Sequence, residues 1–475
     1  MTPILTLITL VIYLALLFVV ARVTSRSADN KNFFTGGRRT PAWVVALAMV
    51  GAPMTGVTFI SVPGMVAQSS FAYLQMVLGF IVGSVVIAYL LIPLYYKHKV
   101  TSLYEYLDSR FGLCSHRCGA WLFLLSKLLG TALKTLVACM VVQQLLCNYL
   151  GIPFWLTAVV FVLLVWLYTY RGGVSSVVWI DAIKTICMAT CAVLCIVFVL
   201  RELGLSPTEA VSAASDRGLS QILFIECWSD NRHFAKMFLA GVFMIIAMTG
   251  LDQDMMQRAL SSRSQKAAQQ NIILASLLQT VIITLLLSLG AIFYLYLADV
   301  GTVVERGDEV FAFVATQEGM PAIISILLVL GVMAATFSAT GGALTSLTTS
   351  FMVDILQKSG GSATLRKAIH FATAAALVVL ILAFNQWGND STINLVYRVA
   401  GYTYGPLLGM FAFGIFTKRR TYDKLVPLVA IIALLICLVL DYNSEGWFDG
   451  YEFGFEILLL NATITIGGLY CISRK

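Results

Sequence analysis

The hexapeptide Gly51-Ala52-Pro53-Met54-Thr55-Gly56 lies in the middle of an apolar run, residues 42–66, which is long enough to cross a bilayer. Proline removes a backbone donor and glycine tolerates non-helical angles, so the segment predicts a break or a kink in a helix. Broken backbone is tolerated at membrane depth only beside protein or a cavity, because its polar groups need partners there. A break would free carbonyl oxygens for a cation, whereas a simple proline kink would only bend the helix.

The composition of the whole chain is that of an integral membrane protein. Of its 475 residues, 59% are hydrophobic and 12% are charged, whereas soluble domains carry about 25% charged residues. Most of the chain is therefore expected to lie in the lipid bilayer. In a membrane protein the net charge of +7 is no sign of nucleic-acid binding. Nearly all of the ten cysteines fall within apolar runs, which favours buried thiols over disulfides.

Apolar runs predict about thirteen transmembrane helices. Their expected spans are 4–22, 42–66, 71–96, 118–149, 153–170, 175–200, 235–257, 269–298, 320–356, 368–386, 392–416, 424–441 and 455–472. No basic residue precedes the first run, so we expect an uncleaved helix with its N-terminus outside.

Basic residues test this topology. The expected inner segments hold 22 Lys and Arg residues and the outer segments hold 5. Because cytoplasmic loops are enriched in Lys and Arg, this bias supports the orientation and predicts a cytoplasmic C-terminus. We therefore expect a multi-pass protein of the plasma (cytoplasmic) membrane.

Several motifs resemble those of the sodium:solute symporter family, and they occur in the family's order and spacing. The stronger ones are Arg171-Gly172-Gly173 with 177–181, Gly250-Leu251-Asp252-Gln253 with 257–260, and 401–409 with Gly414, Phe416 and Lys418-Arg419; weaker ones are 34–38 and 101–107.

This resemblance implies an all-α LeuT-like fold within a single transmembrane domain, 1–475. Inverted repeats of five helices would span 42–200 and 235–416, with one extra helix at 4–22 and two at 424–472. It also implies secondary active transport, in which cation-coupled symport carries a small organic solute through a midplane site. The sialic-acid and sugar branches of the family are nearest in organisation. No cofactor is expected beyond Na⁺ as the coupling ion.

The family's sodium site can be carried over residue by residue. The carbonyls of Gly51 and Met54 and the carbonyl of Ala335 would be ligands, together with the hydroxyl of Ser338. Oxygen ligands suit a hard cation. The second hydroxyl position is Ala339, which has none, and the serines that bind a second sodium in some members are here Gly341-Gly342.

One further departure concerns the helix that carries Asp181, which matches the family's aspartate at this site. Three residues later the family usually has Gln, and this chain has Lys184. That spacing allows the two side chains to pair. Alternatively, the Lys184 ammonium replaces the bound cation. In that case transport would be proton-coupled or uncoupled, and uptake would depend more on pH than on sodium.

Basic residues at membrane depth suggest the charge of the substrate. Lys127, Lys134, Lys184 and Arg398 face only one expected acid, Asp181. Because desolvated charges need partners, the excess favours a small anion, such as a sialic-acid-like or other carboxylate. In the alternative interpretation Lys127 and Arg398 reach the two membrane surfaces, which leaves only Lys134 unexplained. The candidate substrate contacts are Thr55, Thr58, Tyr73, Lys134, Tyr397 and Arg398.

Other classes of function have less support. Ile245 and Met248 stand where the sugar branch has an asparagine and a gating tyrosine, which argues against a neutral-hexose site. A transporter-like sensor would need a partner protein, and we expect no obligate protein partner. The chain's four histidines form no metal or catalytic spacing, so an enzyme is not expected. The expected partners are therefore a small solute, Na⁺ or H⁺, and the lipid bilayer.

Overall fold

A computed structural model describes most of the chain. The described residues are 3–24, 41–98, 102–228, 230–260, 262, 264–317, 320–357, 363–387, 392–448, 451 and 453–474. The motif at 34–38 lies outside them, and the side chains of Arg171, Gly172 and Gly173 are likewise outside the description.

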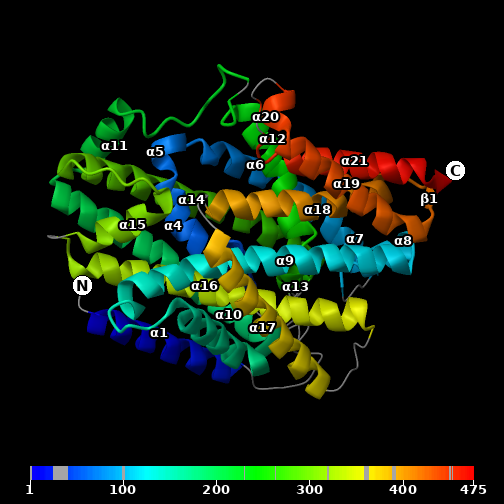
Figure 1. Ribbon diagram of the computed structural model, residues 1–475, viewed down its shortest axis with the longest axis horizontal. Coiled ribbons are helices and arrows are strands. Elements are labelled where there is room, and N and C mark those ends of the chain that lie inside the picture. The colour runs from blue at the N-terminus through cyan, green and yellow to red at the C-terminus, as the bar shows by residue number, and fades with distance from the viewer. Residues whose placement is uncertain are drawn as a thin grey trace.

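Helices make up nearly all of the described structure, and the one sheet is a pair of two-residue strands, β1 and β2 (Figure 1). The elements, in chain order, are α1 (Pro3–Thr24), α3 (Ala42–Gly51), α4 (Gly56–Gly64), α5 (Val66–Ser69), α6 (Tyr73–Val86), η2 (Ile87–Leu91), α7 (Ile92–His98), α8 (Glu105–Arg110), α9 (Leu113–Val142), η3 (Gln143–Cys147), α10 (Phe154–Leu203), α11 (Pro207–Asp216), α12 (Phe234–Ile245), η4 (Ile246–Gly250), α13 (Gln253–Leu260), α14 (Gln265–Val300), α15 (Gly307–Thr316), α16 (Ala322–Ser350), η5 (Phe351–Ile355), α17 (Ala363–Trp387), α18 (Thr392–Phe416), β1 (Arg420–Thr421), η6 (Asp423–Leu425), α19 (Val426–Tyr442), α20 (Ser444–Trp447), α21 (Ile457–Cys471) and β2 (Ser473–Arg474).

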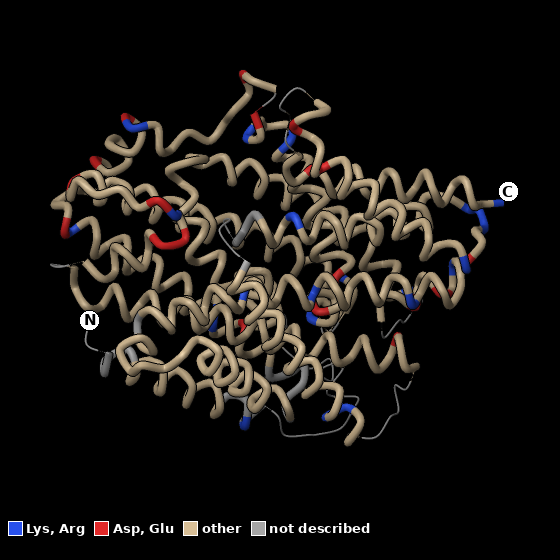
Figure 2. Tube along the Cα trace, in the orientation of Figure 1, with Lys and Arg blue, Asp and Glu red and all other residues tan. Residues whose placement is uncertain are grey.

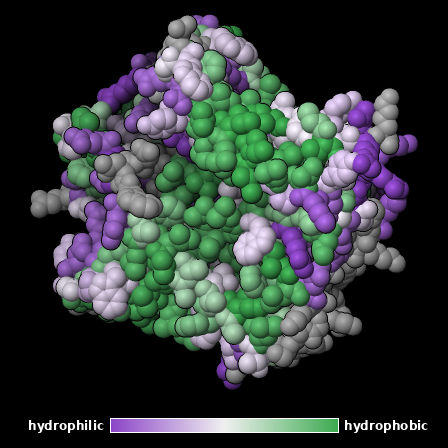
Figure 3. All heavy atoms as spheres, turned by 45° about the vertical axis from the view of Figure 1, so that its right-hand side comes forward, coloured by the Kyte–Doolittle hydropathy of each residue, from purple (hydrophilic) through white to green (hydrophobic). Residues whose placement is uncertain are grey.

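The helices are apolar enough to lie in a membrane. Among the described residues, eight are long enough to cross it, and two bent pairs bring the number to ten. Three shorter apolar helices, Leu7–Val19, Phe154–Tyr170 and Ile457–Cys471, coincide with other expected spans. Figure 3 shows a broad hydrophobic surface flanked by hydrophilic residues, as a lipid-facing protein requires. A multi-pass membrane protein is therefore confirmed, while the count of thirteen spans stays a prediction.

Two helices that the sequence predicted as separate are joined by helical backbone in the structure. The sequence predicted separate helices at 153–170 and 175–200, but the backbone is helical throughout Phe154–Leu203 (α10). Of its two apolar parts, Val177–Leu203 is long enough to be a candidate span, and Phe154–Tyr170 is a shorter apolar helix. The connection between them is thus made of helical backbone.

The predicted break in the first long apolar run is present. α3 ends at Gly51 and α4 begins at Gly56, with a bend of 56° between the two axes. Thr55 adopts an extended conformation, and its amide donates to the Thr58 hydroxyl at 3.3 Å. This side-chain acceptor satisfies one of the donors that a helix start leaves unpaired.

A second break, which the sequence analysis did not predict, divides the expected span 235–257. The segment from α12 through η4 is bent by 70° against α13. The freed carbonyls of Gly250 and Leu251 accept hydrogen bonds from the hydroxyls of Tyr95 (2.8 Å) and Tyr104 (3.1 Å). Because these partners are buried, the broken backbone is stable at membrane depth.

The two ends of the chain lie at opposite ends of the molecule's long axis (Figure 1). The strands β1 and β2 pair antiparallel at the C-terminal end, where Lys and Arg residues gather along the chain (Figure 2). Long helices run between these ends, and both broken pairs lie among them. The fold therefore brings the two breaks into the interior, where a binding cavity can form.

Candidate functional site

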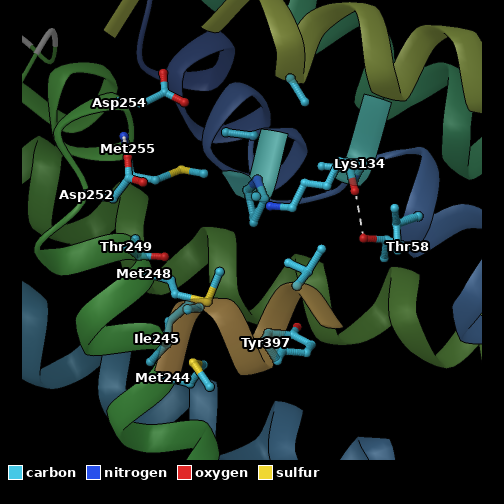
Figure 4. A pocket seen from close by; sticks show the side chains of 18 of the residues that line it. Thr58, Lys134, Met244, Ile245, Met248, Thr249, Asp252, Asp254, Met255 and Tyr397 are labelled. Atoms are coloured by element: carbon cyan, nitrogen blue, oxygen red, sulfur yellow. Dashed lines mark hydrogen bonds between the residues drawn. The ribbon is translucent and has the colours of Figure 1, made fainter. Parts of the chain in front are cut away.

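A cavity of about 110 Å³ lies between the two broken helix pairs and the helices α9 and α18. Lining residues come from both breaks, from Ala52 to Thr58 on one side and from Met244 to Met255 on the other. Figure 4 shows Lys134 of α9 extending into this space, with Thr58 on one side and Thr249 and Asp252 across from it. The cavity is thus at the place where the sequence predicted a substrate site.

Five of the six predicted substrate contacts line this cavity, namely Thr55, Thr58, Tyr73, Lys134 and Tyr397. The structure therefore brings together side chains that are far apart in the sequence. Their role in binding stays a prediction.

Arg398 does not belong to this cavity. Its side chain is 53% exposed and lies 3.9 Å from Asp441, at the molecule's surface. Consecutive residues of a helix point about 100° apart, so the inward position of Tyr397 turns Arg398 away. The expectation that Arg398 binds substrate is therefore not met by the geometry.

Two tyrosines separate the cavity from a wider vestibule. The hydroxyls of Tyr73 and Tyr397 are hydrogen-bonded at 2.6 Å. Tyr73 also lines the vestibule, a space of about 620 Å³ beside Arg232, Glu305 and Arg398 on the side predicted to be extracellular. The tyrosine pair thus lies between the cavity and the vestibule.

Acidic residues of the second break hold Lys127. Its Nζ lies 3.0 Å from Oδ2 of Asp252 and 2.8 Å from Oδ2 of Asp254. Asp252 also accepts from the hydroxyl of Tyr404 (2.7 Å) and from the backbone amide of Met255 (3.1 Å). Asp252 therefore caps the start of α13 and neutralises a lysine of α9 at the same time.

The ion pairs continue from α13 to α10 and α16. Nη1 of Arg258 lies 2.6 Å from Asp254, and its Nε donates to Oδ2 of Asp181 at 2.8 Å. The other oxygen of Asp181 accepts from the Ser338 hydroxyl and lies 3.3 Å from Nζ of Lys184. Arg258, Asp181, Lys184 and Ser338 are all buried. We call the set Lys127, Asp252, Asp254, Arg258, Asp181 and Lys184 the ion network.

The predicted excess of about three positive charges is wrong. Asp252 and Asp254 are buried acids that the sequence analysis did not place at membrane depth, and Arg258 is a buried cation rather than an inner-surface residue. Three cations and three acids balance within the ion network. Among the described residues that line the cavity, Lys134 is the one cation without an ion pair. The argument for an anionic substrate therefore depends on Lys134 alone.

Three of the residues predicted to bind sodium, Gly51, Asp181 and Ser338, lie beside Lys184. A Cβ atom added at Gly51 would lie 2.8 Å from the carbonyl oxygen of Asp181 and 3.2 Å from Cε of Lys184. Because Asp181 also contacts Ser338 and Lys184, these four residues form one cluster. The Gly51 carbonyl already accepts from the amide of Met54, 3.0 Å away. The Lys184 ammonium thus stands among the proposed ligands, with Asp181 as its ion-pair partner.

The glycines of α16 leave room for the arginine of the ion network. A Cβ atom at Gly342 would overlap Nη2 of Arg258 and lie 3.1 Å from Oδ1 of Asp254. This position is one of those where some symporters carry a serine for a second sodium. In this chain the guanidinium takes the space beside Asp181 and Asp254.

A known protein family matches most of the chain. Residues 33–423 match the model described as "Sodium:solute symporter family". The chain belongs to this family. It is therefore a membrane transporter of the sodium-coupled symport class, which carries a small organic solute.

Similar proteins support this assignment over most of the symporter's length. The sodium/sialic acid symporter SiaT of Proteus mirabilis (strain HI4320) is 25% identical over 471 residues, covering 95% of this chain and 92% of that protein. The human sodium/iodide cotransporter is 23% identical over 434 residues, covering 89% of this chain and 66% of the cotransporter.

A solved structure confirms the fold. A Na⁺-coupled sialic acid symporter in a substrate-bound outward-open state matches with a TM-score of 0.83 and 20% identity, and 99% of each chain is covered. A nucleobase-cation-symport-1 family transporter in a closed conformation matches with a TM-score of 0.60 and 14% identity, covering 93% of this chain and 94% of that one. The all-α LeuT-like architecture of this symporter is thereby confirmed, while the boundaries of its repeats stay predictions.

Asp252 and Asp254, which line the cavity, and Arg258, which pairs with Asp254, were not among the predicted site residues. The second break could have been predicted from the inverted repeats. A break in the first helix of one repeat implies a break in the first helix of the other. Gly250-Leu251-Asp252-Gln253 has the residues for it, with a flexible glycine followed by an aspartate that can cap a new helix.

Proposed function

We propose that this symporter carries a small organic anion across the cytoplasmic membrane, with the substrate carboxylate bound by Lys134. The observation that supports this most is the ammonium of Lys134, which has no ion pair among the described residues and extends into the cavity beside Tyr73 and Tyr397. An anion would supply the missing partner, and a charge-assisted contact is about twice as strong as a neutral hydrogen bond. Both relatives described above transport anions by name, sialic acid and iodide.

The orientation is part of the proposal. The N-terminus would lie outside and the C-terminus in the cytoplasm, because Lys and Arg gather near the C-terminal end (Figure 2). Substrate would then enter through the vestibule and pass the tyrosine pair.

Uptake into proteoliposomes tests the proposed function. The full-length protein would be given labelled carboxylates and a neutral sugar, each with an inward sodium gradient and with an equal potassium gradient. We expect saturable, sodium-stimulated uptake of a carboxylate. Saturable uptake of the neutral sugar with none of any carboxylate would contradict the proposal.

A second candidate function concerns the coupling ion. Lys184 is 1% exposed and lies beside Gly51, Asp181 and Ser338, where the family's sodium ligands fall. Its ammonium could take the place of the coupling cation, so that transport would no longer need sodium at this position. Uptake that is equal in sodium and in potassium would favour this alternative over sodium coupling.

Ser338→Ala is expected to raise the sodium concentration needed for half-maximal uptake. The change removes the one side-chain hydroxyl retained from the family's site, which contacts Asp181. Loss of one hydrogen-bonding group predicts an effect of about threefold to tenfold. Ser346→Ala is the matched control, because Ser346 lies in the same helix and its hydroxyl donates to the carbonyl of Ala343 (3.0 Å). Equal sodium activation in the two variants would rule out the assignment of Ser338.

Tyr397→Phe is expected to speed the exchange of substrate on the vestibule side. The change removes the hydrogen bond to Tyr73 but keeps the ring, which packs against Phe455 at 5.1 Å. One lost bond predicts about threefold to tenfold faster counterflow exchange in proteoliposomes. Tyr402→Phe is the control, since its hydroxyl bonds Asp441 instead. Unchanged exchange in Tyr397→Phe would show that the pair is not a gate.

A further inference from the structure

A groove of about 620 Å³ lies where α18 meets the end of α19, and it shares no lining residue with the cavity. The residues that line it are Arg398 and Tyr402 of α18, 438–439 and 441–445 at the end of α19 and in α20, and Phe453. Charged groups of both signs therefore lie beside apolar side chains in this groove, which we call the α18–α19 groove.

Arg398 supplies the positive charge of the groove. Its side chain is 53% exposed, and its one ion pair among the described residues joins Nε to Oδ2 of Asp441 at 3.9 Å. The two terminal nitrogens of the guanidinium make no ion pair within the described part of the chain. An arginine whose terminal nitrogens are available can bind a phosphate group through two parallel hydrogen bonds.

Asp441 and Glu445 supply the negative charges. Oδ2 of Asp441 accepts from the Tyr402 hydroxyl, whereas its Oδ1 has no hydrogen-bond partner among the described residues. Glu445 is exposed, and within the same residues it makes no ion pair. With Arg398, the described lining carries one positive and two negative charges. A ligand with an ammonium group as well as a phosphate group would therefore complement the groove.

An exposed apolar face of α19 leads to this groove. Leu428, Ile431, Leu435, Val439 and Tyr442 follow one another at spacings of three or four residues, and each is more than half exposed. Because residues at these spacings share one side of a helix, they form a continuous strip, which we call the α19 strip. Val439 and Tyr442 also line the groove. An acyl chain can therefore pack along the strip while its headgroup lies in the groove.

Aromatic side chains indicate the depth of the groove in the membrane. Tyr442, Trp447 and Phe448, at the end of α19 and in and after α20, are 90%, 59% and 45% exposed. Tyrosine and tryptophan are enriched at the level of the lipid headgroups, where one end of the ring system is apolar and the other is wet. The groove is thus placed where the headgroup of a phospholipid lies.

We propose that the α18–α19 groove binds phosphatidylethanolamine from the leaflet on the vestibule side. The phosphate contacts Arg398, the ammonium contacts Asp441 and Glu445, and one acyl chain lies along the α19 strip. A primary ammonium donates three hydrogen bonds, whereas the trimethylated ammonium of phosphatidylcholine donates none. Phosphatidylglycerol has no ammonium group for the two carboxylates, so its negative charge meets the acidic excess of the groove.

Thermal unfolding of the full-length protein in detergent tests this site with short-chain lipids. Dihexanoyl-phosphatidylethanolamine is expected to raise the unfolding midpoint in a saturable way, because a ligand that binds the folded state stabilises it by mass action. The phosphatidylcholine and phosphatidylglycerol of the same chain length should give much smaller shifts. Equal shifts with all three lipids would overturn the recognition of the headgroup.

Phosphoethanolamine without acyl chains distinguishes a lipid from a free phosphate ester. It carries the same charged groups but cannot use the α19 strip, so at the same concentration it should not shift the midpoint. A shift equal to that of the lipid would overturn the phospholipid as the occupant.

Arg398→Gln is expected to raise the lipid concentration for a half-maximal shift about tenfold or more, because it removes a charged partner of the phosphate. Arg201→Gln is the matched control, since Arg201 is exposed in the last turn of α10 and lies outside the groove. Equal half-maximal concentrations in these two variants would overturn the phosphate contact.

Glu445→Gln provides a second measurement that does not depend on Arg398. Glu445 is exposed, so the variant is expected to fold normally and to weaken the binding of phosphatidylethanolamine about twofold to fivefold. Glu202→Gln, at an exposed position near the end of α10, makes the same change of charge outside the groove. Equal binding by these two variants would overturn the contact between Glu445 and the ammonium.

Discussion

Lys134→Ala is expected to abolish saturable uptake of a carboxylate while the protein still folds and inserts. The ammonium is the one unpaired cation of the described cavity, so its removal leaves the substrate carboxylate without a charged partner. Loss of a hydrogen bond to a charged group corresponds to about 10- to 100-fold weaker binding. Uptake by proteoliposomes measures the loss of transport, and thermal unfolding of the same preparation measures whether the variant still folds.

The matched control for this variant is Lys266→Ala. Lys266 is exposed at the start of α14, away from the cavity and from the vestibule. We expect this variant to transport normally. Normal transport by Lys134→Ala would disprove the carboxylate contact, and a Lys134→Ala protein that no longer folds would assign the lysine a structural role instead.

Lys184→Gln is expected to increase the apparent affinity for sodium about tenfold or more. Two unit charges 4 Å apart repel by about 4 kcal/mol at an effective dielectric constant of 20, so an ammonium among the proposed ligands opposes a sodium ion there. Asp181 offsets part of this repulsion, because its carboxylate lies beside the ammonium. The measurement is the sodium dependence of uptake in the wild type and in the variant.

A second neutral side chain separates charge from shape. Lys184→Met has a similar length and is expected to change the sodium dependence in the same direction, because only the charge matters to the repulsion. Asp181 keeps Arg258 as its partner in both variants, so neither leaves this carboxylate unpaired. Strong sodium stimulation of the wild type that neither variant increases would return Lys184 to a structural role as the partner of Asp181.

The first break could be predicted because its cause is local. Pro53, Gly51 and Gly56 disfavour a continuous helix through their own backbone chemistry. Five of the six residues predicted as substrate contacts line the cavity, and their role in binding stays a prediction. The second break has no proline, and its stability depends on Tyr95 and Tyr104, which are about 150 residues away in the chain. Such distant partners cannot be read from the segment itself.

The predicted charge balance at the site was wrong for a related reason. Counting charged residues by expected depth left Asp252, Asp254 and Arg258 at the membrane surface, because a straight helix would end near them. The bend turns α13 inward and buries all three. The prediction for Arg398 was wrong for the opposite reason. Its depth along the helix was estimated from the sequence, but the side of the helix on which it lies is determined by packing, and this side faces Asp441 at the surface.

The contact between Gly342 and Arg258 implies a rule of covariation for related sequences. A serine at 342 and this guanidinium cannot share the same space, because even a Cβ atom overlaps Nη2. Relatives that keep an arginine in this pose should therefore carry glycine at the position of 342, and relatives with serine there should place their arginine elsewhere. An attempt to engineer a second sodium site would need both positions changed together, since Gly342→Ser alone would displace Arg258 from Asp181 and Asp254.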